Sequence, residues 1–219
     1  MSLTDRIEQS LKLPKKHKPQ RAVKGTLCRS FSLDGNLFIE KFDLVHGTES
    51  MENRNFRAKA IVDLLMSIEC SLKSLCIALS KDNEPPVKAY KNARNHSHKL
   101  NKLYKEVEKR AKNRFAIPSI HTIFDDLKEL GVSSRYAYEI WLIRMNSNDK
   151  EMFFEEDLIS RTLDDVTWAK AVREEAVKLN ALSDKCYSKY MAKHCILRGK
   201  KFKQYHMHLQ NFLSEVTRS

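Results

Sequence analysis

The sequence predicts a mainly α-helical protein, a helical bundle built on two long helices. Apolar residues recur every three or four positions between Phe56 and Leu79, and again between Val166 and Tyr190. This spacing places them on one face of a helix. Glycine and proline, which interrupt helices, are rare, with five of each among 219 residues. Hydrophobic residues form 42% of the chain beside 31% charged residues, the balance of a folded protein. An all-β fold is therefore disfavoured.

The first long helix is expected to begin after Gly47, with Thr48 as its N-cap, and to end before Pro85 and Pro86. A threonine side chain at this position accepts a hydrogen bond from a free backbone N–H group. The helix carries one continuous apolar stripe, which is typical of a core helix. The stripe consists of Phe56, Ala60, Ile61, Leu64, Leu65, Ile68, Leu72, Leu75 and Leu79.

The segment before this helix is expected to lie outside the bundle. Residues 1–25 contain two prolines and a run of lysines, which indicates a basic N-terminal arm. Asp34 and Gly35 form a turn signal between apolar residues, so a short β-hairpin competes here with a loop that leads into a helix near Leu37 to Val45. We therefore divide the chain into residues 1–47, an arm with a short hairpin or helix, and residues 48–219, the bundle.

Two shorter helices are expected in the middle of the chain. Ser97 is the predicted N-cap of a basic helix that continues through Leu100, Leu103, Tyr104, Val107 and Ala111. A second short helix is predicted from His121 to Leu130, closed by Gly131. Between these helices we expect the break at Pro118.

The last third of the chain begins with the most acidic stretch. We expect a small β-hairpin insertion after residue 134, with an acidic insertion near residues 145–163. A second long helix is predicted to start at Asp164 and Asp165. A final helix, Lys200–Val216, would pack back on the bundle or against a second subunit. The complete prediction is two long and two to three shorter helices.

Composition also narrows the class of protein. The five cysteines are read as reduced thiols of a cytoplasmic protein. No stretch has the roughly 18 to 20 apolar residues that cross a bilayer, so we expect no membrane partner. No Cys-x-x-Cys pair or other zinc-finger spacing occurs, which predicts no structural zinc and no cofactor. The Gly-rich phosphate loop and the Gly-x-Ser-x-Gly elbow of common enzymes are also missing from the sequence.

The net charge of +12 points to a polyanionic partner. Residues 9–33 and 185–214 each hold seven basic residues and no acidic one, and the second stretch is interleaved with aromatic residues. Such clustering predicts nucleic-acid binding, although a solvated, merely solubilising helix face is the alternative. The residues predicted to contact RNA are Lys189, Lys193, Arg198, Lys200, Lys201, Lys203 and Tyr205.

Two short motifs resemble those of a known family. The long apolar helix is followed by Ser97-His98-Lys99-Leu100, and the segment 131–136 ends in an Arg-Tyr pair. Over residues 56–138 this arrangement resembles the HEPN family of small helical domains. The resemblance implies a helical bundle, homodimerisation, and a place in a toxin–antitoxin or phage-defence system, with an antitoxin or a nucleotidyltransferase as a partner.

The resemblance also implies a candidate catalytic site at Arg94, Asn95 and His98. In HEPN ribonucleases an arginine stabilises the developing phosphate charge and a histidine transfers a proton, which requires no metal. Three residues separate Arg94 from His98, fewer than the family's four to six. On a helix this i, i+4 spacing would still place both side chains on one face. The alternative is that His98 has a structural role at a helix start.

Two functions follow as expectations. The first is an RNA-directed HEPN-type protein, acting as an RNA-binding module or as a metal-independent endoribonuclease. The second is a non-catalytic, dimerising interaction module that recruits a partner protein. Whether the chain is an enzyme is left open by the sequence.

Overall fold

The protein is a bundle of α-helices, as the sequence predicts. The computed structural model describes residues 18–96, 99–112, 117–118, 121–130, 160–194 and 200–217, and these contain seven α-helices, one short 3-10 helix and no strand. Three predictions lie outside the described residues: the first seventeen residues of the basic arm, the β-hairpin insertion, and most of the acidic insertion. No described helix is both long and apolar enough to cross a bilayer.

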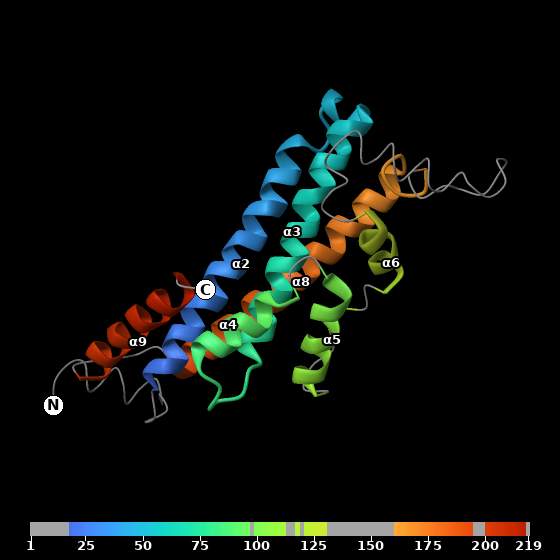
Figure 1. Cartoon of the computed structure of the whole chain (residues 1–219). Coiled ribbons are helices and arrows are strands. Elements are labelled where there is room, and N and C mark those ends of the chain that lie inside the picture. Colours follow the sequence, from blue (N-terminus) through green and yellow to red (C-terminus); the bar gives the residue numbers. More distant parts are fainter. Residues whose placement is uncertain are drawn as a thin grey trace.

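Three long helices form the body of the molecule (Figure 1). They are α2 (Pro19–Val45), α3 (Arg54–Ala78) and α8 (Val166–His194). Helix α2 runs antiparallel to both others (Figure 1). Helix α3 lies at the centre, and from Ala58 to Ile77 almost every residue is buried. The sequence predicted α3 and α8, whereas α2 is a third long helix.

Residues 19–45 form one continuous helix rather than the hairpin considered for the Asp34-Gly35 signal. Gly35 lies in its middle, at a close approach of all three long helices. A Cβ atom at Gly35 would lie 2.8 Å from the Asn180 side chain and 3.3 Å from the Ser67 carbonyl oxygen. The glycine is therefore required by helix packing, which a local turn signal cannot reveal.

The start of α3 differs from the prediction in its capping residue. Residues Glu49–Glu52 form a 3-10 helix, and Asn53 is the N-cap, accepting hydrogen bonds from the backbone N–H groups of Asn55 and Phe56. Thr48 instead donates to the carbonyl of Val45 at 2.7 Å. Arg57 holds this end together, because its guanidinium donates to the carbonyls of Met51 and Leu163.

Two cations stabilise the other end of α3. Lys24 of α2 donates to the Ser80 hydroxyl at 2.9 Å and to the Lys81 carbonyl at 2.8 Å. Arg110 donates to the carbonyl of Cys76, one of the last four residues of α3. Positive charge is favourable at a helix C-terminus, where backbone carbonyls have no partner in the helix. Burial lowers the pKa of Lys24 to about 8.

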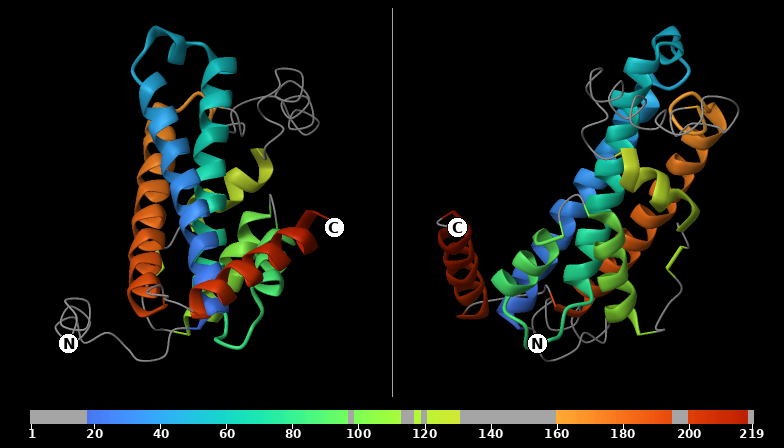
Figure 2. Two further views of the ribbon diagram at one scale, coloured as in Figure 1. Left: turned by 90° about the vertical axis from the view of Figure 1, so that its left-hand side faces the viewer. Right: turned by 45° about the vertical axis from the view of Figure 1, so that its right-hand side comes forward.

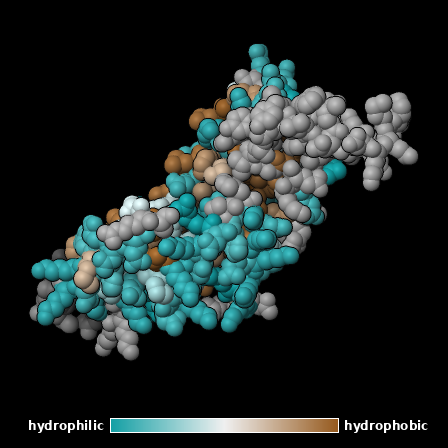
Figure 3. Space-filling view, in the orientation of Figure 1, coloured by the Kyte–Doolittle hydropathy of each residue, from teal (hydrophilic) through white to brown (hydrophobic). Residues whose placement is uncertain are grey.

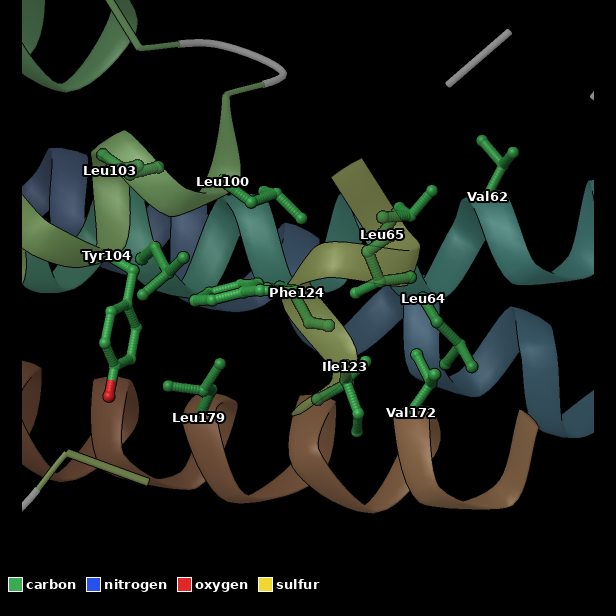
Figure 4. Close-up of a cluster of buried hydrophobic side chains, with 14 of the residues drawn as sticks. Val62, Leu64, Leu65, Leu100, Leu103, Tyr104, Ile123, Phe124, Val172 and Leu179 are labelled. Atoms are coloured by element: carbon green, nitrogen blue, oxygen red, sulfur yellow. The ribbon is translucent and has the colours of Figure 1, made fainter. Parts of the chain in front are cut away.

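The two predicted middle helices cover one side of α3 and α8. They are α5 (Leu100–Ala111) and α6 (His121–Leu130). Figure 4 shows side chains of both helices pointing into a common apolar cluster with α3 and α8. The rings of Tyr104 and Phe124 meet edge to face at 5.0 Å, and the Tyr104 hydroxyl donates to the Pro118 carbonyl. Helix α5 begins at Leu100 with Lys99 as N-cap, and the predicted cap Ser97 lies outside the described residues.

Helices α4 (Pro86–Arg94) and α9 (Lys200–Thr217) complete the bundle. No helix was predicted from the sequence for the segment of α4, and Pro86 is its first helical residue, a position that proline favours. Helix α9 was predicted at nearly the same bounds. It lies outside the three long helices, over the N-terminal half of α2 (Figure 2).

Candidate nucleic-acid interface

Helix α9 is attached to the bundle by few contacts. Phe212 is its one buried residue, 5% exposed, and its ring meets Tyr90 of α4 edge to face at 5.2 Å. Tyr90 in turn stacks on Phe31 of α2 at 6.2 Å. The Tyr205 hydroxyl lies 3.0 Å from the Thr26 hydroxyl of α2, within hydrogen-bond distance. These contacts fix one face of α9 and leave the rest of the helix exposed.

The first two turns of α9 present positive charge. Lys200, Lys201 and Lys203 are all exposed. No ion pair between described residues includes any of these three lysines. Their charges are therefore available to an external anion.

An exposed aromatic ring lies among these lysines. Phe202 is 49% exposed, and its ring meets the exposed His206 edge to face at 4.6 Å. Tyr205 is also close, with ring centroids 6.3 Å apart. An exposed phenylalanine face is a surface on which a nucleic-acid base can stack.

Helix α4, which contacts α9, and helix α5, on another side of the bundle (Figure 2), also carry exposed cations. Helices α4, α5 and α9 all lie over the lower half of the bundle in Figure 1, and Figure 3 shows this half as mainly hydrophilic. Their exposed cations, like those of α9, are in no ion pair between described residues. They are Lys88, Lys91 and Arg94 of α4, and Lys99, Lys102, Lys105, Lys109 and Lys112 around α5.

Cations on the long helices behave differently, because several are neutralised within the bundle. Arg54 and Arg57 both pair with Asp164, and Arg173 forms a two-pronged pair with Asp43. The hydrogen bond from Arg173 lowers the pKa of Asp43. The available positive charge is thus concentrated at one end of the molecule.

Of the predicted catalytic residues, Arg94 is the last residue of α4 and Asn95 is its C-cap. The Arg94 guanidinium lies over the Tyr90 ring, 5.6 Å from its centroid. Both residues are exposed, whereas His98 lies outside the described residues. Helix α4 ends at Arg94 and α5 begins at Leu100, so no described helix contains both positions 94 and 98, and the alignment of Arg94 with His98 stays a prediction.

The predicted RNA-binding residues divide into three groups. Lys200, Lys201 and Lys203 share the exposed surface described above, and Tyr205 is half-buried because its hydroxyl contacts α2. Lys189 and Lys193 belong to the last turns of α8, but their side chains, like all of Arg198, lie outside the described residues. Phe202 is an apolar residue of the final helix, which was expected to pack on the bundle or against a second subunit, and its side chain is exposed rather than packed on the bundle. Its position within the lysine run was the signal that could have identified it.

The described residues give less support to a reactive thiol or to a metal site. Burial raises the pKa values of the Cys28, Cys70 and Cys76 thiols, so these thiols stay protonated and unreactive near neutral pH. No group of three potential metal ligands occurs in the described parts of the chain.

A second exposed surface is apolar and lies on α2. Leu33, Leu37 and Leu44 are 52%, 59% and 80% exposed, and their spacing places them on one face of the helix. Contiguous apolar surface of this kind often marks a protein–protein contact.

Comparison of the chain with protein-family models, curated proteins and solved structures finds no match.

Proposed function

We propose that this protein binds RNA through the basic surface of α9, as the RNA-directed member of a toxin–antitoxin or phage-defence system. The observation that supports the proposal best is the exposed Phe202 ring between exposed lysines that form no ion pair with any other described residue. Lysines bind phosphates through charge, while an aromatic ring binds an unpaired base by stacking. The combination favours single-stranded RNA, because bases in a duplex cannot reach the ring.

The charge component is tested by neutralising Lys200, Lys201 and Lys203 to Gln and measuring RNA binding by fluorescence anisotropy over a salt series. We expect at least tenfold weaker binding, and a slope of log affinity against log salt that falls by about 2, since single strands lose about 0.7 per contact. The matched control removes three lysines from the opposite half, as Lys59→Gln, Lys170→Gln and Lys178→Gln. Equal losses of RNA affinity in both triple variants would mean that binding depends on net charge rather than on a site at α9.

The stacking component is tested with Phe202→Ala. Loss of one stacked base is expected to cost about 1–3 kcal/mol of affinity for an unstructured oligoribonucleotide, and little for a duplex of equal length. Phe202→Tyr should retain binding because it retains the ring. Leu213→Ala, which removes another exposed apolar side chain from α9, is the control. Wild-type protein that prefers the duplex would contradict the proposal.

A cleavage reaction at Arg94 and His98 is a narrower form of the proposal, supported by the resemblance and by the exposed position of Arg94 near the α9 surface. The test is RNA cleavage in the presence of EDTA by wild type, Arg94→Ala and His98→Ala. Lys91→Ala, one turn before Arg94 on the same basic helix, is the control. Cleavage that survives both substitutions would exclude this site, while RNA binding without cleavage would leave a binding module.

A dimerising interaction module is the second candidate function, and the exposed leucines of α2 favour it. Its test is sedimentation velocity over a concentration series, in which a module of this kind forms a dimer. A monomer at every concentration would argue against it without affecting the RNA proposal.

A further inference from the structure

The apolar stripe of α2 faces outward between its two neighbouring helices. Leu33, Leu37, Glu40 and Leu44 follow one another at steps of four, three and four residues, which aligns them along the helix. On one flank of the stripe Lys41 reaches Asp63 of α3 at 2.8 Å, and on the other Asp43 pairs with Arg173 of α8. Neither neighbouring helix covers the leucines, which are between 52% and 80% exposed.

A groove runs beside this stripe, between α2 and α8. Its volume is about 400 Å³, and its lining is half apolar, from Leu33, Ile39, Val177 and Ala181, and half polar, from Ser32, Asn36, Asn180 and Asp184. Val177 is itself 38% exposed. The leucines form a ridge, and the groove forms a recess beside it on the same face. A second apolar helix could place its side chains in the recess.

The charges on this face are self-complementary. Asp34 and Lys41 are seven residues, or about two turns, apart and lie on the same flank of the stripe. If two copies of α2 cross antiparallel about a two-fold axis near Leu37, Asp34 of each copy lies opposite Lys41 of the other. A parallel pairing would instead bring Glu40 of the stripe near Glu40 of the other copy, which is unfavourable, and would place Asp34 and Lys41 on opposite sides of the interface. The Lys41 side chain is 65% exposed, so its contact with Asp63 leaves it accessible.

We propose that this chain forms a two-fold symmetric homodimer in which the α2 helices pack antiparallel, with Leu37 of each copy next to the two-fold axis. This inference rests on the dimerising role proposed as the second candidate function and names its partner and geometry. It is independent of RNA binding by α9. An isologous contact of this kind buries the same face on both copies, which leaves the α9 surface of each copy free.

Cysteine cross-linking in the full chain tests the geometry. A short bismaleimide is expected to cross-link Leu37→Cys, because this residue lies next to the axis. Leu44→Cys should stay uncross-linked, since two copies of residue 44 would lie about 20 Å apart along the helix. Wild-type protein gives the background from its own thiols, of which Cys28, Cys70 and Cys76 are buried. Cross-linking of both variants would indicate a parallel pair and overturn the proposal.

Charge substitutions test the interface by a second readout. Leu37→Asp should abolish the dimer in sedimentation velocity, while Met207→Asp, an equally exposed apolar position on α9, should leave it unchanged. Asp34→Lys should weaken the dimer by about threefold to tenfold, as expected for two exposed ion pairs replaced by repulsion. Glu108→Lys, the same charge change on α5, is its control.

Three outcomes would separate this proposal from the alternatives. A dimer that persists in Leu37→Asp would place the interface elsewhere, which overturns the geometry but not the dimerising role. A wild-type monomer at every concentration would contradict both. A dimer that appears only after removal of residues 1–17 would show that the N-terminal segment of the same chain occupies the α2 face, and would also overturn the proposal.

Discussion

Helices α3 and α9 both carry polar and apolar residues, yet they differ in their place in the fold. Eighteen of the 25 residues of α3 are buried, whereas α9 buries only Phe212. The difference is not one of apolar content alone, because α3 buries Ser71, Ser74, Glu69 and Lys73 as well. Helices α2, α4, α5 and α8 contact α3, whereas the main contacts of α9 with the described helices are to α2 and α4. The comparison separates a helix that holds the protein together from one that is free to bind a ligand.

The buried polar groups of α3 are tolerated because they have partners. Ser74 donates to the Cys28 carbonyl at 3.0 Å, and Ser71 to the Asn180 side chain at 3.2 Å. Glu69 and Lys73 pair with each other one turn apart. On α9, by contrast, the lysines have no partner within the described residues. The charged residues Glu69 and Lys73 of α3 are therefore part of the buried core, whereas the lysines of α9 are exposed to solvent.

The largest expected effect is loss of a leucine from the centre of α3. Leu72 is fully buried, and Leu72→Ala should lower the free energy of unfolding by about 2–5 kcal/mol through lost apolar contact and the cavity left behind. Met207→Ala, from the exposed part of α9, should change it by less than about 0.5 kcal/mol. Urea denaturation of both variants measures the contrast. Similar values would contradict the division between the two helices.

The next effect concerns Lys24, which supports the C-terminal end of α3. The folded protein releases its proton near pH 8, whereas the unfolded chain retains that proton to near pH 10.5. The unfolded state binds more protons in this window, so the contribution of Lys24 to the free energy of unfolding rises with pH, by about 3 kcal/mol.

Urea denaturation of wild type and Lys24→Met at pH 7 and pH 10 measures this contribution as a difference of differences. Subtracting the values of Lys24→Met from those of wild type removes the pH dependence of all other titratable groups, which the two proteins share. We expect wild type to gain stability relative to Lys24→Met as the pH rises. A constant difference between the two proteins would show that Lys24 is accessible to water.

A smaller effect is expected at Gly35, where α2 crosses α3 and α8. On a solvent-exposed helix Gly→Ala is stabilising by about 1 kcal/mol. At Gly35 the new methyl group would meet Asn180 and the α3 backbone, so Gly35→Ala should destabilise the protein by about 1–2 kcal/mol. Thermal unfolding of the variant gives the sign directly. A higher melting temperature would mean that the three helices can separate without cost.

The smallest expected effect on stability concerns the exposed lysines of α9. Neutralising Lys200, Lys201 and Lys203 removes no contact within the described bundle, so each change should alter the free energy of unfolding by less than about 0.5 kcal/mol. The same variant is expected to lose RNA affinity. Loss of both stability and affinity would mean that these lysines belong to the fold rather than to a binding surface.

Regular periodicity was the reliable guide to the helices. It gave α6 at its observed bounds, α9 within one residue at its end, and α3 and α8 over most of their length. Periodicity was a weaker guide to helices where the local composition indicated turns or a flexible arm. The full length of α2 was not predicted, because its segment contains lysines, a proline and the Asp34-Gly35 turn signal. Helix α4 was not predicted because Pro85 and Pro86 indicated a break. In both cases local signals for turns were overridden by packing, Gly35 against α3 and α8, and Pro86 as a first helical residue.

The candidate interface was predicted in part. Lys200, Lys201 and Lys203 follow from clustered charge, because a run of lysines without acids has no partner nearby in the sequence. The role of Phe202 did not follow, since an apolar residue at helical spacing has the same pattern whether it faces a core or the solvent. The alignment of Arg94 with His98 stays a prediction, because α4 ends at Arg94 and residue 98 lies outside the described residues.

The amino-acid sequence by itself determined that the chain is helical, where most helices lie, and that positive charge accumulates near its C-terminal end, since these properties depend on neighbours along the chain. Only the tertiary structure decided which charges are neutralised, which face of α9 remains exposed, and that the leucines of α2 face outward. Those properties depend on contacts between residues far apart in sequence. A helical period indicates that a face exists, but the helices that pack around it determine whether that face becomes core or binding surface.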